Sequence, residues 1–81
     1  MGIEGFVPVF MLLIMTLSEL FGKNVRSARI DKGWTQEQLA FEAGVKRGYV
    51  SEIENGKRNP SLDVVEKIAD ALGLKPAKLL G

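Results

Sequence analysis

The side chains of this sequence that could do chemistry are cationic and polar rather than catalytic. The 81 residues include no Cys and no His, which removes disulfides, thiol nucleophiles, the commonest zinc ligands and the usual general base. No glycine-rich phosphate loop is present and no paired acids stand on a cleft-like element, so an enzyme is the weakest functional hypothesis. The formal net charge is only +1, so the distribution of charge matters more than its sum.

The segment from Lys23 to Arg58 has a local excess of positive charge, since it contains eight Lys or Arg residues and five Asp or Glu residues. The excess is mild, and solvated helix faces account for most of it. Two of the cations, Lys57 and Arg58, lie in a loop punctuated by Gly, Asn and Pro at residues 55–60.

The segment 35–54 would position the cationic and polar side chains in it and next to it. Its sequence pattern predicts two short helices joined by a tight turn. Thr35 is a candidate N-cap and Gln38 follows three residues later, as in a capping box. Gly44 can take the positive φ that ends a helix, which places the turn at 44–46. Apolar residues recur at helical spacing in both halves, at Leu39, Ala40, Ala43, Val50 and Ile53.

Further helices are predicted on both sides of this pair, so the sequence is all-α. A first helix is expected at 18–32, with Ser18 as N-cap and Gly33 as its stop, although Gly22 weakens its first turn. Trp34 is expected to wedge at the junction with the next helix. Ser61 should cap a fourth helix and Pro76 should open a short last one. The fourth helix carries an apolar stripe at Leu62, Val65, Ile68, Ala69 and Leu72.

Residues 1–21 differ from the rest because the run Phe6–Leu17 carries no charge. Twelve residues are fewer than the roughly 20 that span a bilayer as a helix, and no basic segment precedes them as in a signal peptide. We therefore expect a hydrophobic arm or helix extension that docks on its own domain or on a second subunit, in a cytoplasmic protein without membrane association. Translation could instead begin at Met11 or Met15.

The run from Val25 to Leu80 resembles the DNA-binding domain of the Xre/Cro/phage-repressor helix-turn-helix family. The match is carried by Arg29, Thr35–Ala40, Gly44, Ile53–Arg58, Pro60–Leu62 and Ile68–Gly73. Within the family, Arg47–Glu54 is similar to the small controller proteins of restriction–modification systems. The resemblance implies a five-helix lambda-repressor-like domain over residues 22–81, preceded by the arm at 1–21.

The resemblance also implies that helix 46–54 enters the major groove of double-stranded DNA. Arg47 would donate to guanine, while Glu52 would either accept from a cytosine amino group or repel phosphates of the wrong register. Base reading is expected from Lys46, Arg47, Gly48, Tyr49 and Glu52. Phosphate contacts are expected from Thr35, Gln36, Ser51, Asn55, Lys57 and Arg58, with a solvated loop as the alternative for the last two. Many relatives carry a polar residue at the position of Gly48. Glycine has no side chain that could contact a base, but it allows the helix backbone to approach the DNA closely.

The sequence thus predicts a sequence-specific transcriptional regulator that acts as a homodimer on a pseudo-palindromic operator, with no cofactor and no small-molecule ligand. An internal ion pair between Arg29 and Glu54 is implied by the resemblance. Dimer contacts are expected from Leu74, Leu79 and Leu80, or from the arm. The alternative function is a protein-interaction or membrane-associated adapter that uses the apolar arm.

Overall fold

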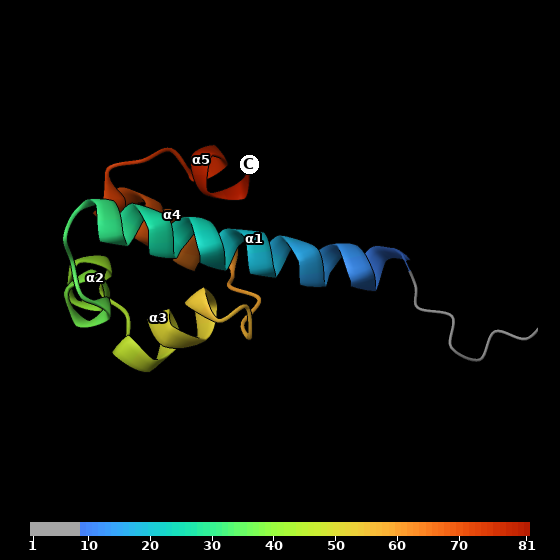
Figure 1. Cartoon of the computed structure of the whole chain (residues 1–81), viewed down its shortest axis with the longest axis horizontal. Coiled ribbons are helices and arrows are strands. Elements are labelled where there is room, and N and C mark those ends of the chain that lie inside the picture. The colour runs from blue at the N-terminus through green and yellow to red at the C-terminus, as the bar shows by residue number, and fades with distance from the viewer. Residues whose placement is uncertain (1–8) are drawn as a thin grey trace, which may run out of the picture.

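The computed structural model describes residues 9–81, with side chains from Leu17 onward, and this part of the chain contains helices and no strand. In Figure 1, α1 runs across the middle of the view, with α2 and α3 below it, α5 above it and α4 crossing behind it, where α4 packs against α2 and α5. The helices are α1 Val9–Asp31, α2 Gln36–Ala43, α3 Arg47–Glu54, α4 Leu62–Leu72 and α5 Pro76–Leu80.

α1 begins well before the predicted position, so Ser18 lies inside the helix and the prediction that it is the N-cap was wrong. Nothing in residues 9–17 ends a helix, because the stretch holds no Gly, Pro or Asn. The part of the predicted arm from Val9 onward is therefore helical backbone, and it extends past the other helices in Figure 1. Residues 1–8 lie outside the described residues. No helix in the described range is both long and apolar enough to cross a membrane.

The two predicted caps of α2 are present, but only half of the capping box forms. The Gln38 backbone N–H donates to Thr35 Oγ1 at 3.1 Å, and Gly44 ends the helix at φ 70°. The Gln38 side chain does not return to the cap, because its Nε2 donates to Glu42 Oε2 at 3.0 Å. The predicted turn at 44–46 separates α2 from α3.

The core draws a side chain from every helix, and its fully buried large members are Phe21, Val25, Leu39, Val50, Ile53, Ile68 and Leu79. Leu79 was predicted to lie at a dimer contact, and this was wrong, because its exposed fraction is 1%. α5 is little more than one turn long and points this leucine inward. Asn24 Nδ2 on α1 donates to the Leu79 carbonyl at 2.9 Å and so fixes α5 against α1. Trp34 packs partly buried against the core, as predicted.

Gly22 lies where α1 crosses α3. A Cβ atom built on this glycine would lie 2.1 Å from the carbonyl oxygen of Ile53. The glycine that weakens the helix in sequence terms is therefore the residue that allows the two backbones to meet. This crossing sets the position of α3 on the domain.

Candidate nucleic-acid interface

α3 has one buried and one exposed face. Val50 and Ile53 are fully buried, whereas Arg47, Gly48 and Glu52 are exposed. Tyr49 is half-buried and Lys46 is the exposed N-cap residue of α3. The structure therefore places all the predicted base-reading residues along the outward face and N-terminus of one helix at the edge of the domain (Figure 1).

An ion pair supports α3 from behind. Arg29 Nε donates to Glu54 Oε2 at 2.7 Å and Arg29 Nη2 donates to Glu54 Oε1 at 2.9 Å, which is a bidentate fork. Arg29 Nη1 also donates to the Trp34 carbonyl at 2.8 Å. The side chains are 12% and 2% exposed. The hydrogen bond to Glu54 raises the pKa of Arg29, so the guanidinium stays charged at any physiological pH.

Gln36 extends this network to α2, because its Nε2 donates to Glu54 Oε1 at 3.1 Å. The side-chain amide that we had expected at a phosphate is thus turned toward the ion pair. Arg29, Gln36 and Glu54 tie α1, α2 and α3 together, which fixes the angle of the helix pair.

An open hollow of about 410 Å³ lies between the N-termini of α2 and α3. Its lining brings Arg47 beside the start of α2, where Thr35 caps the helix and first-turn N–H groups face outward. The positive N-terminal ends of the two helices and the Arg47 guanidinium would attract an anion to this hollow, whereas the Glu37 carboxylate, which also lines it, would repel one.

Arg58, in the loop that follows α3, folds back and contacts the outward face of that helix. Its Nε donates to Glu52 Oε1 at 2.7 Å, and its guanidinium carbon lies 4.7 Å from the centroid of the Tyr49 ring. The hydrogen bond to Glu52 raises the pKa of Arg58. Ser51 is half-buried, while Asn55 and Lys57 are exposed. The contact of Arg58 with Glu52 was not predicted, since six residues and a loop separate them.

A family model described as helix-turn-helix matches residues 25–79. The chain belongs to this helix-turn-helix family. It is 53% identical over 62 residues to control protein C.BamHI of Bacillus amyloliquefaciens, covering 75% of this chain and 76% of the relative. It also resembles the solved restriction-modification controller protein C.AhdI from Aeromonas hydrophila, with a TM-score of 0.75 and 44% identity over 76% of this chain and 94% of that one. The hypothetical transcription factor NHTF from Neisseria gives a TM-score of 0.78 and 42% identity, covering 80% and 75% of the two chains.

The comparisons confirm the predicted resemblance to this helix-turn-helix family and the five-helix fold class. Members of this helix-turn-helix family are DNA-binding transcriptional regulators rather than enzymes, and membership in it supports double-stranded DNA as the partner. In helix-turn-helix motifs in general, the second helix of the pair is the recognition helix. α3 occupies that position in this chain.

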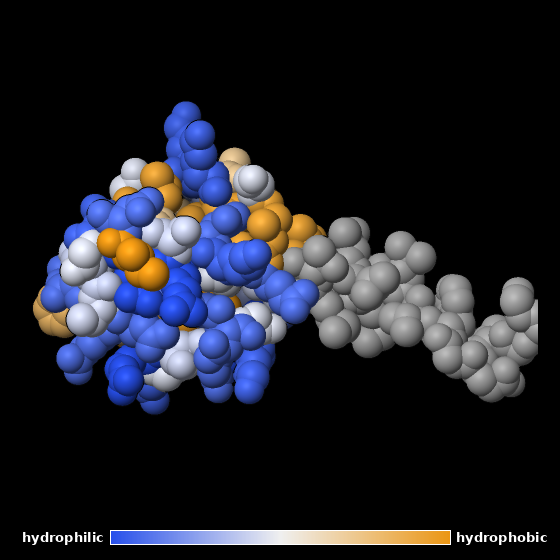
Figure 2. Space-filling model, in the orientation of Figure 1, coloured by the Kyte–Doolittle hydropathy of each residue, from blue (hydrophilic) through white to orange (hydrophobic). Residues whose placement is uncertain are grey.

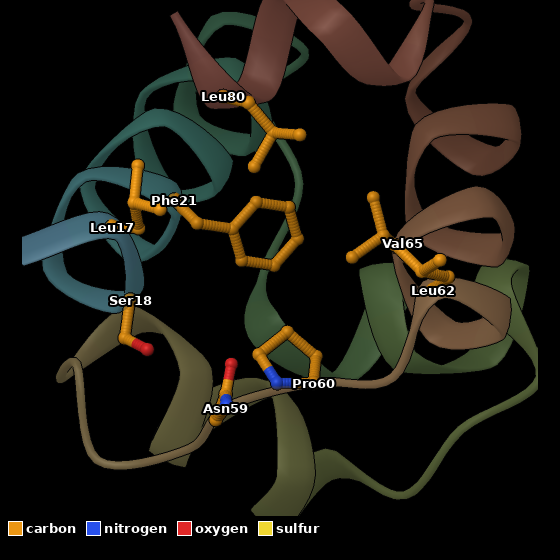
Figure 3. Close-up of a pocket in the computed structure, with 8 residues that line it drawn as sticks. All are labelled: Leu17, Ser18, Phe21, Asn59, Pro60, Leu62, Val65 and Leu80. Atoms are coloured by element: carbon orange, nitrogen blue, oxygen red, sulfur yellow. The ribbon is translucent and has the colours of Figure 1, made fainter. Parts of the chain in front are cut away.

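This helix-turn-helix domain also carries an apolar groove of about 140 Å³, away from α3. Phe21 of α1 points into it, between Leu80 of α5 and Val65 of α4, with Pro60 closing the lower end (Figure 3). Leu62 lines it and is 80% exposed, so this first residue of the predicted apolar stripe lies outside the buried core that the other four join. Figure 2 shows hydrophobic side chains gathered next to the point where α1 leaves the domain, and hydrophilic ones over most of the rest of this view.

Proposed function

We propose that the chain is a sequence-specific regulator that inserts α3 into the major groove of its operator. The observation that carries this proposal is the outward face of α3, where Arg47, Gly48, Tyr49 and Glu52 stand together on a helix held from behind by the Arg29–Glu54 ion pair. A rigidly supported helix with a polar outward face suits the groove, where each base pair presents its own pattern of donors and acceptors.

Arg47 is our leading candidate for direct base contact. It is exposed at the first turn of α3, and its guanidinium can donate to guanine O6 and N7 together. Gly48 follows it, and apart from the adjoining backbone of α3 no part of the protein lies within 4 Å of the position where a Cβ would be. The backbone of α3 can therefore come close to the DNA at this position. Lys46 and Tyr49 would contact neighbouring bases.

Phosphate contacts would flank α3 on both sides. On one side, the first turn of α2 with Thr35 and Gln36 offers backbone N–H groups over the hollow beside Arg47. On the other side, Ser51, Asn55 and Lys57 would contact the opposite strand. Each phosphate that is neutralised should steepen the salt dependence of log K by about 0.9.

A homodimer would place two reading helices about 34 Å apart, one helical turn of the operator. The apolar groove supports this part of the proposal, because Leu17, Leu62 and Leu80 leave apolar surface uncovered around it. Leu74, between α4 and α5, is 36% exposed. The controller proteins among the relatives support a role in a restriction–modification system, where the chain would repress or activate a promoter.

One observation favours a second candidate, a protein-interaction adapter: α1 continues through the uncharged residues 9–17 beyond the rest of the domain. A chain that begins at Met15 distinguishes the two. Regulation through DNA predicts that this shortened chain still binds DNA, and an adapter predicts that it loses its main partner.

Selection of binders from a randomised DNA duplex library tests the leading proposal. It is done at about 150 mM salt, because the salt ions screen much of the non-specific attraction between the protein and DNA phosphates. Enrichment of a two-fold symmetric motif with a guanine in each half-site is the expected result. Weak, salt-sensitive binding without enrichment would contradict it.

A further inference from the structure

Arg58 was expected to contact a DNA phosphate, but its side chain is engaged within the protein. It lies in the loop after α3, yet its side chain folds back over the helix and contacts two residues of the reading face. It donates to Glu52 at 2.7 Å and its guanidinium lies 4.7 Å from the Tyr49 ring centroid. Because Tyr49 and Glu52 are three residues apart, they are neighbours on one face of α3, and one planar guanidinium spans them both.

We infer that Arg58 is a positioning residue for base recognition, which holds the Glu52 carboxylate and the Tyr49 ring in their reading conformations, and is not an anchor for a DNA phosphate. This inference rests on the proposed role of α3. It assigns Glu52 to an amino group in the major groove, most simply N4 of cytosine, for which a carboxylate is the matching acceptor.

The first argument is exposure. The side chains of Arg58 and Glu52 are 52% and 51% exposed, and an ion pair this accessible contributes little to folding. What such a pair can do is restrict the rotamers of a flexible glutamate before DNA arrives, so that less conformational entropy is lost on binding.

The second argument is charge. A phosphate that captured Arg58 would take it from Glu52 and leave a bare carboxylate beside the polyanionic backbone. A guanidinium that keeps Glu52 neutralised prevents that repulsion. Because the Arg58 charge is already compensated within the protein, it would release few DNA counterions on binding.

Lys57 is the matched comparison. It is the adjacent residue in the same loop, it is exposed, and the ion pairs of the described residues do not include it. Lys57 should therefore behave as an ordinary phosphate contact. The two neighbouring cations are expected to act on different properties of binding.

The test compares Arg58→Ala, Glu52→Ala, the double variant and Lys57→Ala by library selection and by affinities measured across a salt series. We expect Arg58→Ala and Glu52→Ala to relax the preference at the same base pair by roughly tenfold, since one good base contact is worth about that factor. The double variant should be no worse than either single one. Lys57→Ala should keep the motif and lower the salt slope by about 0.9.

Arg58→Lys adds a second readout, because lysine keeps the charge but cannot span both partners with a planar fork. We expect it to bind non-cognate DNA as tightly as the wild-type chain does, because the charge beside Glu52 is kept, but to show the relaxed base preference of Arg58→Ala. The inference is overturned if Arg58→Ala weakens all sequences equally and lowers the salt slope by about 0.9, or if Glu52→Ala leaves the motif unchanged. If the wild-type chain enriches no motif at all, the proposed function fails instead, so the two failures are distinguishable.

Discussion

Arg29 on α1 donates to both carboxylate oxygens of Glu54 at the end of α3, at 2.7 and 2.9 Å. The pair joins the first helix of the domain to the helix that we propose reads DNA. Since the Glu54 side chain is only 2% exposed, its charge depends on Arg29 for compensation, and Gln36 adds one hydrogen bond to the carboxylate.

Glu54→Ala should lose folding before it loses any base contact. Removal of one partner of a buried ion pair strands the other charge, and this typically costs about 3–5 kcal/mol of unfolding free energy. Chemical denaturation measures the change. Glu52→Ala is the control, because its exposed carboxylate should change stability by no more than about 0.5 kcal/mol. Normal melting of Glu54→Ala would contradict the structural role of the pair.

Gly22→Ala should destabilise the domain by about 1–3 kcal/mol, the range for overpacking, because the new Cβ would meet the Ile53 carbonyl oxygen at 2.1 Å. The same substitution at Gly48 meets nothing within 4 Å beyond the adjoining backbone of its own helix. Gly48→Ala should therefore gain about 0.5–1 kcal/mol from helix propensity. Thermal and denaturant unfolding of both variants check the opposite signs, and equal effects at the two positions would refute the close crossing of α1 and α3.

Gly48→Gln should separate stability from binding. The position of a Cβ atom at residue 48 is open in the free protein, so the fold should be retained. If the backbone of α3 approaches the DNA at this position, the added atoms overpack the interface and weaken operator binding by about 1–3 kcal/mol. Titration of the selected operator measures the loss. Undiminished affinity would mean that the backbone stays away from the DNA here.

Leu62→Glu should break the proposed homodimer and reduce operator affinity. Leu62 is 80% exposed beside the groove, and a carboxylate in the first turn of α4 suits the helix dipole, so the monomer should stay folded. Phe41→Gln is the matched control, since Phe41 is 79% exposed but lies on α2, outside the groove. Sedimentation at micromolar concentration gives the oligomeric state. A Leu62→Glu dimer of unchanged strength would place the interface elsewhere.

The helix pair could be predicted from the sequence because its signals are local. Thr35 and Gly44 act on the backbone within one turn of their own positions, and the stripe of Val50 and Ile53 marks the buried face without reference to any partner. The family motifs added the expected positions of Arg29 and Glu54, which the structure brings together.

The rest depended on how distant segments meet. Leu62 and Leu79 are equally apolar in sequence, but the placement of α4 and α5 leaves one exposed and buries the other. Gly22 is unfavourable in an isolated helix and required at a helix crossing. Arg58 contacts Glu52 only because the loop after α3 turns back, and no local pattern encodes that path.

The most direct test of α3 as the reading helix is a double-mutant cycle between Arg47 and one atom of the DNA. The operator recovered by selection is made with 7-deazaguanine, which lacks the N7 acceptor, at the guanine of each half-site. We predict that the wild-type chain loses roughly tenfold or more in affinity per half-site, consistent with about 1–3 kcal/mol for a bidentate contact. Arg47→Gln should bind both duplexes equally. If the two proteins lose the same factor, or if neither loses any, then Arg47 does not read guanine and the account of α3 is wrong.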